Sequence, residues 1–372
     1  PNGAATNQIQ YSFGGLAPNP LSEAGVESLS ATLGGEVRGP RDWRIEGYAA
    51  GAQEIIETTQ TGGIHSGILA EALGNTVDNP ATAYSPTRDG FFNPYASTPS
   101  GNAPATIAAI TSAQSKSRYR SQVGTASLQA DGTLFRLPTG PLREALGVQA
   151  RRETFRSRGS NYSSTAAPAP TRPFTQRRTV ASAFAEFQAP LVPGDADRFG
   201  LQRLEASAAV RAERYSDFGT TVNPRFGLQW TPMTGLLVRA TYGESYRAPA
   251  LFELYNPQTY ASNTVTRGAE RIRNISKLGG NPDLGPETAR SWTMGFDLEP
   301  AAMPDARLAV TAYETKFKNR IDRPLVSAPR GTILTDPAYA PFVRLTSAAT
   351  NPADLAALSE LLASPLFNPR LG

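Results

Sequence analysis

The sequence alternates between apolar and polar residues over segments that are long for strands. Successive side chains of a strand point to opposite faces of a sheet, so each segment has one apolar face and one polar, often charged, face. The period of two is clearest in residues 28–37, 204–213, 236–243 and 291–299. Weaker examples occupy residues 7–14, 43–57, 118–130, 142–156, 178–190, 222–230 and 307–321. We therefore expect an all-β chain of roughly eleven strands, many with the ~9–11 residues that a tilted strand needs to cross a bilayer.

A soluble β-sandwich and a transmembrane barrel both use strands with one apolar face. The segments here are longer than the ~5–6 residues usual for strands of globular proteins. Their apolar faces mix alanine and glycine with large residues, which lipid-facing strands tolerate. No run of about 18 apolar residues is present, which excludes a transmembrane helix. Strands of a membrane barrel alternate, so they escape that criterion.

The connections between the segments alternate between short and long. The short ones carry the proline, glycine and aspartate typical of turns, and they occupy residues 38–42, 131–140, 191–199, 231–235 and 299–306. The others occupy residues 58–117, 157–177, 247–285 and 323 onward, with a small one at 216–221. Outer-membrane barrels have short periplasmic turns and long extracellular loops, and a soluble sandwich has no reason to sort its loops in this way. The pattern therefore predicts a transmembrane, antiparallel, up-and-down β-barrel.

Two tryptophans and one helical segment fit the same topology. Trp43 and Trp230 each lie beside a short turn, where a periplasmic aromatic girdle is expected. Residues 351–365 form the clearest helical pattern, with Asn351 as the expected N-cap and Pro352 at the first helical position. We expect this short helix to lie in the last of the long extracellular loops.

One strand ends in an unusual way, at the sequence TYGESYRAPALFELY of residues 241–255. Pro249 lacks a backbone N–H group, so it cannot donate to a ladder and ends the strand pairing. This places Arg247 and Glu253 at or above the outer rim of the barrel. Pro286 marks the entry into the following strand in the same way.

These residues resemble motifs of the TonB-dependent outer-membrane receptor family. In that family a strand ends in Phe/Tyr-Arg-Ala-Pro, a long outer loop follows, and Asn-Pro-Asp-Leu-x-Pro-Glu opens the next strand. The resemblance extends over about residues 180 to 322. Its motif residues here are Tyr246, Arg247, Ala248, Pro249, Asn281, Pro282, Asp283, Leu284, Pro286 and Glu287.

The resemblance implies nutrient uptake. Receptors of this family are similar to 22-stranded barrels with a plugged lumen; they lie in the outer membrane of Gram-negative bacteria and are energised through TonB. Their ligands include siderophore–iron complexes, cobalamin and oligosaccharides. The sequence shows no plug domain, no TonB box and no closing aromatic residue. We therefore expect residues 1–372 to be part of a single receptor barrel domain, a partial barrel that would reach the TonB complex through a plug absent from this chain.

Two other functions remain open on the sequence alone. A passive porin-like channel differs from the receptor by lacking a plug, and only the family motifs favour the receptor. A soluble β-rich carbohydrate-binding or adhesion protein would pack its apolar faces against each other. The expected partners of a receptor are outer-membrane lipid and an extracellular nutrient ligand.

Candidate contacts to that ligand are charged residues at the rim, a charged residue expected to face the lumen, Arg239, and aromatic residues of the long loops. The aromatic rings could stack on a sugar or a chelate. They could equally pack the loops together. The candidates are Arg239, Arg247, Glu253, Tyr255, Tyr260, Phe91, Phe92 and Tyr95.

Other chemistry has little support in the sequence. His65 is the single histidine and there is no cysteine, so neither a catalytic constellation nor a metal site is indicated. The net charge of +4 is too balanced to indicate nucleic acid as a partner. We expect no enzyme activity, no metal and no cofactor.

Overall fold

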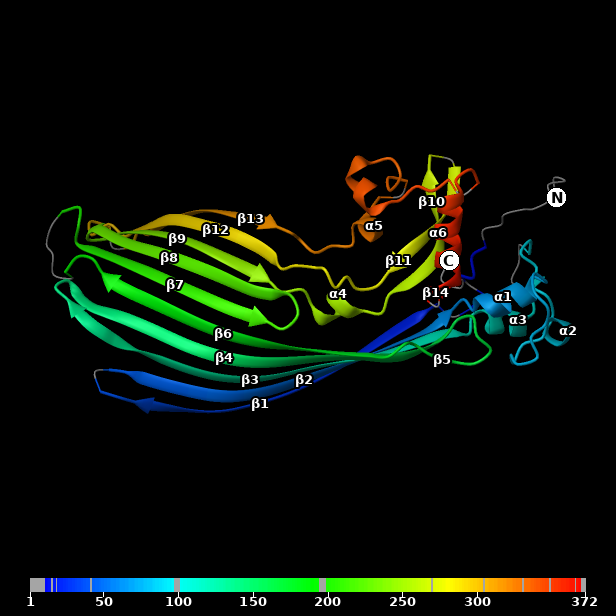
Figure 1. The fold of residues 1–372 in the computed structure, drawn as a ribbon, viewed down its shortest axis with the longest axis horizontal. Helices are drawn as coiled ribbons and strands as arrows, with labels where there is room; N and C mark the ends of the chain where they lie inside the picture. The colour runs from blue at the N-terminus through cyan, green and yellow to red at the C-terminus, as the bar shows by residue number, and fades with distance from the viewer. Residues whose placement is uncertain are drawn as a thin grey trace.

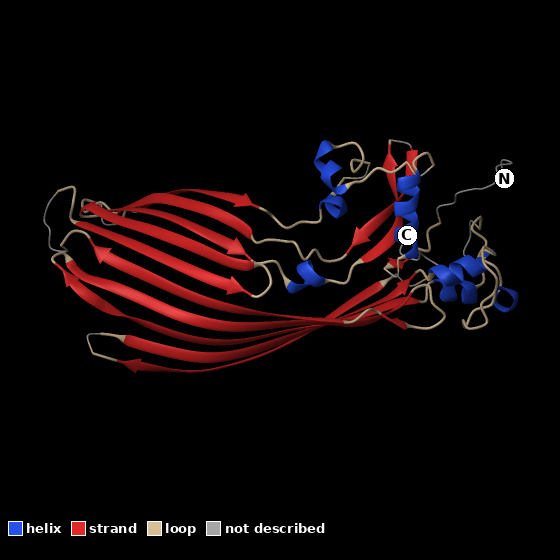
Figure 2. Cartoon of the chain, viewed as in Figure 1, coloured by secondary structure: helices blue, strands red, loops and turns tan. Residues whose placement is uncertain are grey.

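A computed structural model of the chain describes residues 11–14, 16–17, 19–40, 42–96, 101–193, 199–268, 270–303, 305–329, 331–347, 349–364 and 366–368. Its main feature is one long, curved, antiparallel sheet (Figures 1 and 2). The sheet has eleven strands, of which ten lie along its main path. These ten are β1 (Leu21–Arg38), β2 (Arg44–Gly63), β3 (Ala113–Leu137), β4 (Gly140–Tyr162), β6 (Phe174–Pro190), β7 (Arg203–Tyr215), β8 (Gly219–Met233), β9 (Leu236–Arg247), β12 (Glu287–Leu298) and β13 (Leu308–Lys318).

The strands follow one another around the sheet in chain order. Each long strand pairs antiparallel with the next one, and the short β5 (Ala169–Pro170) pairs with β4. Short turns therefore gather at one end and long connections at the other, which confirms the predicted up-and-down arrangement. Within the described residues, β1 and β13 each have a strand partner on one side only. The sheet is thus an open part of a barrel.

Three details of the predicted strands differ from the structure. Residues 58–63, 113–117, 157–162 and 174–177, expected in the long loops, belong to β2, β3, β4 and β6, because strand pairing continues there. Residues 131–137, expected in a turn, continue β3 as a hairpin arm, because Arg136 and Leu137 still pair with Pro141 and Gly140 of β4. The expected strand at 7–14 falls partly outside the described residues, and residues 11–14 contribute only an isolated bridge. Tyr11 and Phe13 instead pack against Phe92 of a long loop. Burial of these aromatic rings accounts for the alternation there without a strand.

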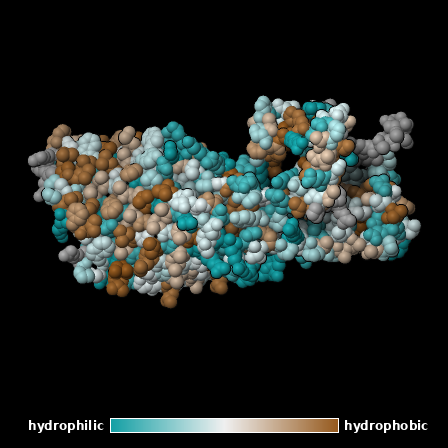
Figure 3. All heavy atoms as spheres, viewed as in Figure 1, coloured by the Kyte–Doolittle hydropathy of each residue, from teal (hydrophilic) through white to brown (hydrophobic). Residues whose placement is uncertain are grey.

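The apolar face of the sheet is uncovered; we call it the outer face and the opposite one the inner face. Leu33 on β1 is 82% exposed, Val148 on β4 is 56% exposed and Phe226 on β8 is 52% exposed. On the side shown in Figure 3, hydrophobic residues gather towards the short turns and hydrophilic residues over the middle of the molecule. A soluble sandwich would bury such a face in its core, whereas a membrane barrel presents it to lipid.

The connection between β2 and β3 folds into a small helical unit with its own core. It contains α1 (Ser66–Ala72), α2 (Pro86–Asp89) and α3 (Pro104–Ile110). The core residues are Ile68, Ala72, Tyr84, Phe92, Ile107 and Ile110. The longest loop of the described chain is therefore ordered by hydrophobic packing rather than by the sheet.

The connection between β9 and β12, expected as a plain loop, contains regular structure. It holds α4 (Leu251–Tyr255) and a hairpin of β10 (Thr259–Arg267) and β11 (Glu270–Leu278). The hairpin forms a second sheet with β14 (Phe367–Asn368), which pairs parallel with β10. In Figure 1 this small sheet stands beyond the loop ends of β9 and β12, above the far ends of the longer strands β2, β3 and β4.

The segment after β13 carries α5 (Pro324–Ser327), the 3-10 helix η2 (Pro337–Phe342) and α6 (Pro352–Ala363). The helix predicted at 351–365 is confirmed as α6: Oδ1 of its N-cap Asn351 accepts a hydrogen bond of 3.0 Å from the Ala353 N–H group. None of the helices in the described ranges is both long and apolar enough to cross a membrane.

Candidate functional site

The inner face of the sheet carries pairs of arginine and carboxylate side chains. Arg211 pairs with Glu213 and Arg203 with Glu205, each within one strand. The candidate residue Arg239 on β9 also lies here. It donates one hydrogen bond to the Asp297 carboxylate and another, of 3.1 Å, to Thr311 Oγ1. Its guanidinium therefore already has partners in the wall.

Arg178 on β6 is the most enclosed cation of this face, with 8% of its side chain exposed. Its Nε donates to Glu153 Oε2 on β4 at 2.7 Å, and its Nη1 donates to the Pro249 carbonyl oxygen at 2.7 Å. The Asp217 carboxylate lies 3.6 Å from the same Nη1. A buried charge is stable only when paired and hydrogen-bonded, and Arg178 meets that condition by joining three separate segments.

The segment after β9 reaches Arg178 because the intervening hairpin of β7 and β8 is shorter than the strands β4 and β6 beside it. β7 ends at Tyr215 and β8 begins at Gly219, and Figure 1 shows α4 just beyond the turn that joins them. The Phe252 ring of α4 lies 6.1 Å from the ring of Phe155 on β4 and 6.4 Å from that of Phe174 on β6. The segment thus passes over the tip of β7 and β8 and docks on the neighbouring, longer strands.

Tyr246 joins β9 to β7 above the point where β8 and β9 stop pairing, at Arg225 and Gly243. Its hydroxyl donates to Glu213 Oε2, and the Tyr215 hydroxyl donates to the same oxygen at 2.8 Å. The two tyrosine oxygens are 3.0 Å apart. These hydrogen bonds take the place of the missing strand pairing.

Arg247 ties together the two ends of the connection between β9 and β12. Its Nε donates to Glu287 Oε2 at 2.8 Å and its Nη2 to Glu253 Oε1 at 3.1 Å. Glu253 Oε2 in turn accepts a 2.7 Å hydrogen bond from the Ala250 N–H group, and Glu287 Oε1 accepts one from Ile321. We call this set of Arg247, Glu253 and Glu287 the rim clasp.

The second motif closes the same structure from the other side. The Asn281 N–H group donates to the Glu253 carbonyl oxygen at 2.8 Å, and Asn281 Oδ1 accepts from the Asp283 N–H group at 3.0 Å. A Cβ on Gly280 would lie 2.6 Å from the Leu254 carbonyl carbon, so this close approach requires glycine. The two motifs therefore anchor one long loop to the rim, which gives both a structural role.

The aromatic candidates are divided between buried and exposed positions. Phe92 is 6% exposed and packs in the core of the helical unit, whereas Phe91 and Tyr95 are 60% and 66% exposed. Tyr255 ends α4 and Tyr260 lies on β10, both half-buried. The candidates brought into mutual contact are thus Arg247 and Glu253, while Arg239 and the loop aromatics lie elsewhere.

His65 has a structural role at the start of α1. Its Nδ1 accepts a 3.1 Å hydrogen bond from the Ile68 N–H group, and its Nε2 lies 3.0 Å from the Thr165 carbonyl oxygen, to which it donates. The ring is 1% exposed, and burial lowers the pKa of His65 below its usual value. The neutral ring therefore serves as the helix cap.

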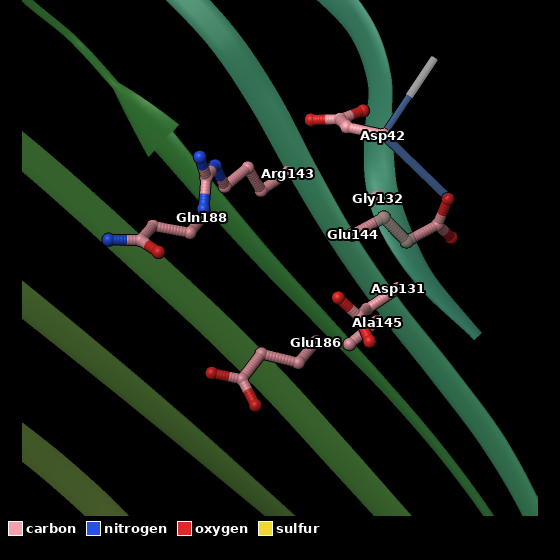
Figure 4. A pocket seen from close by; sticks show the side chains of 8 residues that line it. All are labelled: Asp42, Asp131, Gly132, Arg143, Glu144, Ala145, Glu186 and Gln188. Carbon is pink, nitrogen blue, oxygen red and sulfur yellow. The ribbon is translucent and has the colours of Figure 1, made fainter. Parts of the chain in front are cut away.

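An open hollow of about 180 Å³ lies near the short turns (Figure 4). The Asp42 carboxylate lines this hollow and accepts two hydrogen bonds from Thr133, one of 3.1 Å from the N–H group and one of 2.9 Å from the hydroxyl group. These hydrogen bonds lower the pKa of Asp42. None of the predicted site residues lies in this hollow, whose lining is Asp42, Asp131, Gly132, Arg143, Glu144, Ala145, Glu186 and Gln188.

Sequence reasoning did not single out Arg178, Glu153 or Asp217. The sequence signal available for the first two was their place on the polar side of an alternating segment. Their meeting with Pro249 depends on contacts between distant parts of the chain, since Arg178 and Pro249 are 71 residues apart.

Comparison with known proteins identifies one family model and several solved structures. The model described as "TonB dependent receptor-like, beta-barrel" matches residues 6–345. No curated protein matches the sequence. The solved structures include the RagAB peptide transporter, at 13% identity and a TM-score of 0.49, over 83% of this chain and 33% of that one.

Two further solved structures show a similar level of likeness. The siderophore receptor PirA from Acinetobacter baumannii has 14% identity and a TM-score of 0.40, over 80% of this chain and 44% of that one. A mutant of the ferric enterobactin receptor PfeA from Pseudomonas aeruginosa, in complex with enterobactin, has 14% identity and a TM-score of 0.37, over 84% and 46%. The chain thus spans between 33% and 46% of the length of these proteins.

Proposed function

The chain belongs to the TonB-dependent receptor β-barrel family, and we infer from this that it forms part of the wall of an outer-membrane receptor that takes up a nutrient with energy supplied through TonB. In this proposal residues 1–372 are part of a single barrel domain, and the contact with TonB is made by a plug that lies in another part of the protein. The ligand is a scarce extracellular nutrient such as a siderophore–iron complex, a cobalamin or an oligosaccharide.

The observation that carries the proposal is a sheet with one apolar and one charged face, whose long connections all lie at one end. The outer face is apolar and exposed, as in the 56% exposure of Val148, while the inner face carries charged pairs such as Arg239 and Asp297. A wall of this kind separates lipid from a polar lumen. The large loops at one end are placed to meet a ligand before it enters that lumen.

The exposed loop aromatics are the best-placed ligand contacts among the candidates. The rings of Phe91 and Tyr95 are exposed to solvent. Phe92 is buried in the core of the helical unit, and the Arg247 and Glu253 side chains hydrogen-bond to each other. Aromatic rings bury a large area with little loss of side-chain freedom, so two exposed rings on an ordered unit suit the stacking of a flat or cyclic ligand. We assign Phe91 and Tyr95 to ligand capture and Arg247 to positioning of the loop.

Uptake by the full-length receptor tests this function. We expect one ligand from a panel of ferric siderophores, cobalamin, oligosaccharides and peptides to accumulate in cells, and accumulation to stop when TonB is deleted or the proton gradient is collapsed. Uptake that continues unchanged under both conditions would identify a passive channel instead.

The same assay addresses the loop aromatics. The double substitution Phe91→Ala and Tyr95→Ala should raise the ligand concentration needed for half-maximal uptake. Val77→Ala in the same unit is the matched control, because Val77 is 89% exposed and carries no ring. If both variants change the ligand concentration for half-maximal uptake equally, Phe91 and Tyr95 are not part of the ligand site.

A further inference from the structure

The outer face carries a group of arginines just above its apolar band, towards the long loops. They are Arg152, Arg156 and Arg158 on β4, Arg177 on β6 and Arg214 on β7, and all five are exposed. Their sequence neighbours point to the inner face, where Arg151 and Arg178 are paired with Glu153. In the described part of the chain, no carboxylate lies within salt-bridge distance of any of the five outer arginines. This face therefore holds an uncompensated positive charge.

The strand register gathers three of these arginines around one hydroxyl group. Thr154 lies directly opposite Arg177, so Arg152 and Arg156 are the diagonal neighbours of Arg177 on the same face. Cβ atoms on adjacent strands are about 4.5–5.5 Å apart when opposite and roughly 7–8 Å apart on the diagonal. Three guanidinium groups can therefore reach one bound group beside the Thr154 side chain.

The next strand adds positive charge to the same place. Arg156 lies opposite Arg120 and Arg158 opposite Arg118, both on β3. Arg118 pairs with Glu57, but among the described residues Arg120 donates only to the neutral Gln53 side chain, at 2.7 Å from Nε. Like charges directly opposite each other destabilise a sheet. An anion held between them would relieve that repulsion.

The position of the arginines relative to the apolar band indicates an amphiphilic anion. On the outer face of β4, the residues next towards the short turns are Ala150, Val148 and Leu146, of which Val148 and Leu146 are 56% and 41% exposed. Alternate residues of a strand are about 6.6 Å apart, so this apolar strip begins within reach of the Arg152 side chain. From there it extends along β4 towards the short turns. A free anion would use the arginines and leave the strip unused.

Phosphate is the head-group chemistry that this arrangement suits. The guanidinium fork donates two parallel hydrogen bonds to a phosphate group, and it keeps its charge at every physiological pH. We propose that Arg152, Arg156 and Arg177, with the Thr154 hydroxyl, bind the phosphate groups of a phosphorylated outer-leaflet lipid whose acyl chains lie along Val148 and Leu146. This proposal rests on the proposed function, because it requires the outer face to lie in the outer leaflet.

Lipid binding to the purified full-length receptor tests the proposal. The probes are bis-phosphorylated lipid A, the same lipid after removal of both phosphates, and inorganic phosphate, each titrated in detergent and followed by native mass spectrometry. We expect the triple variant Arg152→Gln, Arg156→Gln and Arg177→Gln to weaken binding of bis-phosphorylated lipid A by roughly a hundredfold or more, since each charge-assisted hydrogen bond lost is worth a factor of about ten.

A second triple variant controls for the loss of charge itself. Arg143→Gln, Arg172→Gln and Arg225→Gln remove the same charge from exposed arginines outside the arginine group and should leave lipid binding within a few-fold of the parent. Equal weakening by both triple variants, equal binding of the dephosphorylated lipid, or inorganic phosphate binding as tightly as the lipid would each overturn the proposal.

The two proposals fail separately. If the receptor function is correct and the lipid site is not, nutrient uptake depends on TonB while both triple variants bind lipid A like the parent. If lipid A binding depends on the three arginines but no nutrient accumulates, the lipid site stands and the receptor function is rejected.

Discussion

Ala208→Arg should prevent the barrel from assembling, whereas Ala209→Arg, at the next residue of β7, should leave assembly intact. Ala208 lies on the outer face between Phe187 and Phe226 of the adjacent strands. Ala209 lies on the inner face between Glu186 and Arg225. An arginine facing lipid near the membrane midplane costs about 2–4 kcal/mol, while one facing a polar lumen keeps its hydration. The same substitution in adjacent alanines therefore tests the assignment of the two faces.

The folded fraction of each variant in outer-membrane extracts provides the measurement, because folded barrels migrate differently from unfolded ones when samples are not heated. We expect little folded Ala208→Arg protein and a near-normal amount of the Ala209→Arg variant. Equal assembly of the two proteins would mean that the outer face does not meet lipid. A deficit confined to Ala209→Arg would mean that the faces are reversed.

Arg178→Met should release the loop between β9 and β12 from the rim. The substitution keeps much of the aliphatic volume but removes the cation between Glu153, Asp217 and the Pro249 carbonyl group. Asp217 has 5% of its side chain exposed, so its charge would be left buried without a counterion. Breaking a buried ion pair by removing one partner costs about 3–5 kcal/mol, and we expect a loss of that size in the free energy of unfolding.

Urea unfolding in lipid vesicles gives the free energy, and protease cleavage within residues 248–286 reports on the loop. Arg225→Met is the matched control, because Arg225 is an exposed inner-face arginine with no carboxylate within salt-bridge distance in the described part of the chain. Its effect should stay within about 0.5 kcal/mol. A loss below about 1 kcal/mol for Arg178→Met, with no added cleavage in the loop, would rule out the anchoring role.

The sheet could be predicted from the sequence because its signal is local. Alternation needs only the next few residues, so the strands around 204–213 and 291–299 were evident. The first segment lies within β7, and the second covers β12 from Ser291 to its end at Leu298. Turn residues between such segments then showed that short and long connections alternate along the chain. The extension of β3 through residues 131–137 escaped prediction because the turn residues of that segment lie inside a hairpin arm.

The rim could be predicted only in outline. The sequence indicated that Pro249 ends a strand and that Arg247 and Glu253 lie near the mouth. The partners of these residues, Glu287 and Arg178, come from strands far away in the chain. The hairpin of β10 and β11 was also missed, because the alternation of apolar and polar residues in residues 259–278 is weak. Whether the candidate ligand residues touch a nutrient stays a prediction.

The rim clasp and the Arg178 site together suggest why the two motifs occur with a long loop between them. Arg247 holds α4 and the first residue of β12 at one place through Glu253 and Glu287. Pro249 is held to β6 through Arg178. Loops that are fixed at both ends lose less conformational entropy when they order around a ligand. We propose that the two motifs help ligand capture by holding this loop at the rim.

The most direct test of the account is the labelling of single cysteines in intact cells. The chain has no cysteine, so Val77→Cys and Phe199→Cys in the full-length protein each provide a single reactive site within this chain. Val77 in the connection between β2 and β3 is 89% exposed, and Phe199 in the connection between β6 and β7 is 90% exposed. The account predicts that a membrane-impermeant maleimide labels Val77→Cys in intact cells and Phe199→Cys only after the outer membrane is opened. Labelling of Phe199→Cys in intact cells, or protection of Val77→Cys, would contradict the outer-membrane barrel with its long loops outside.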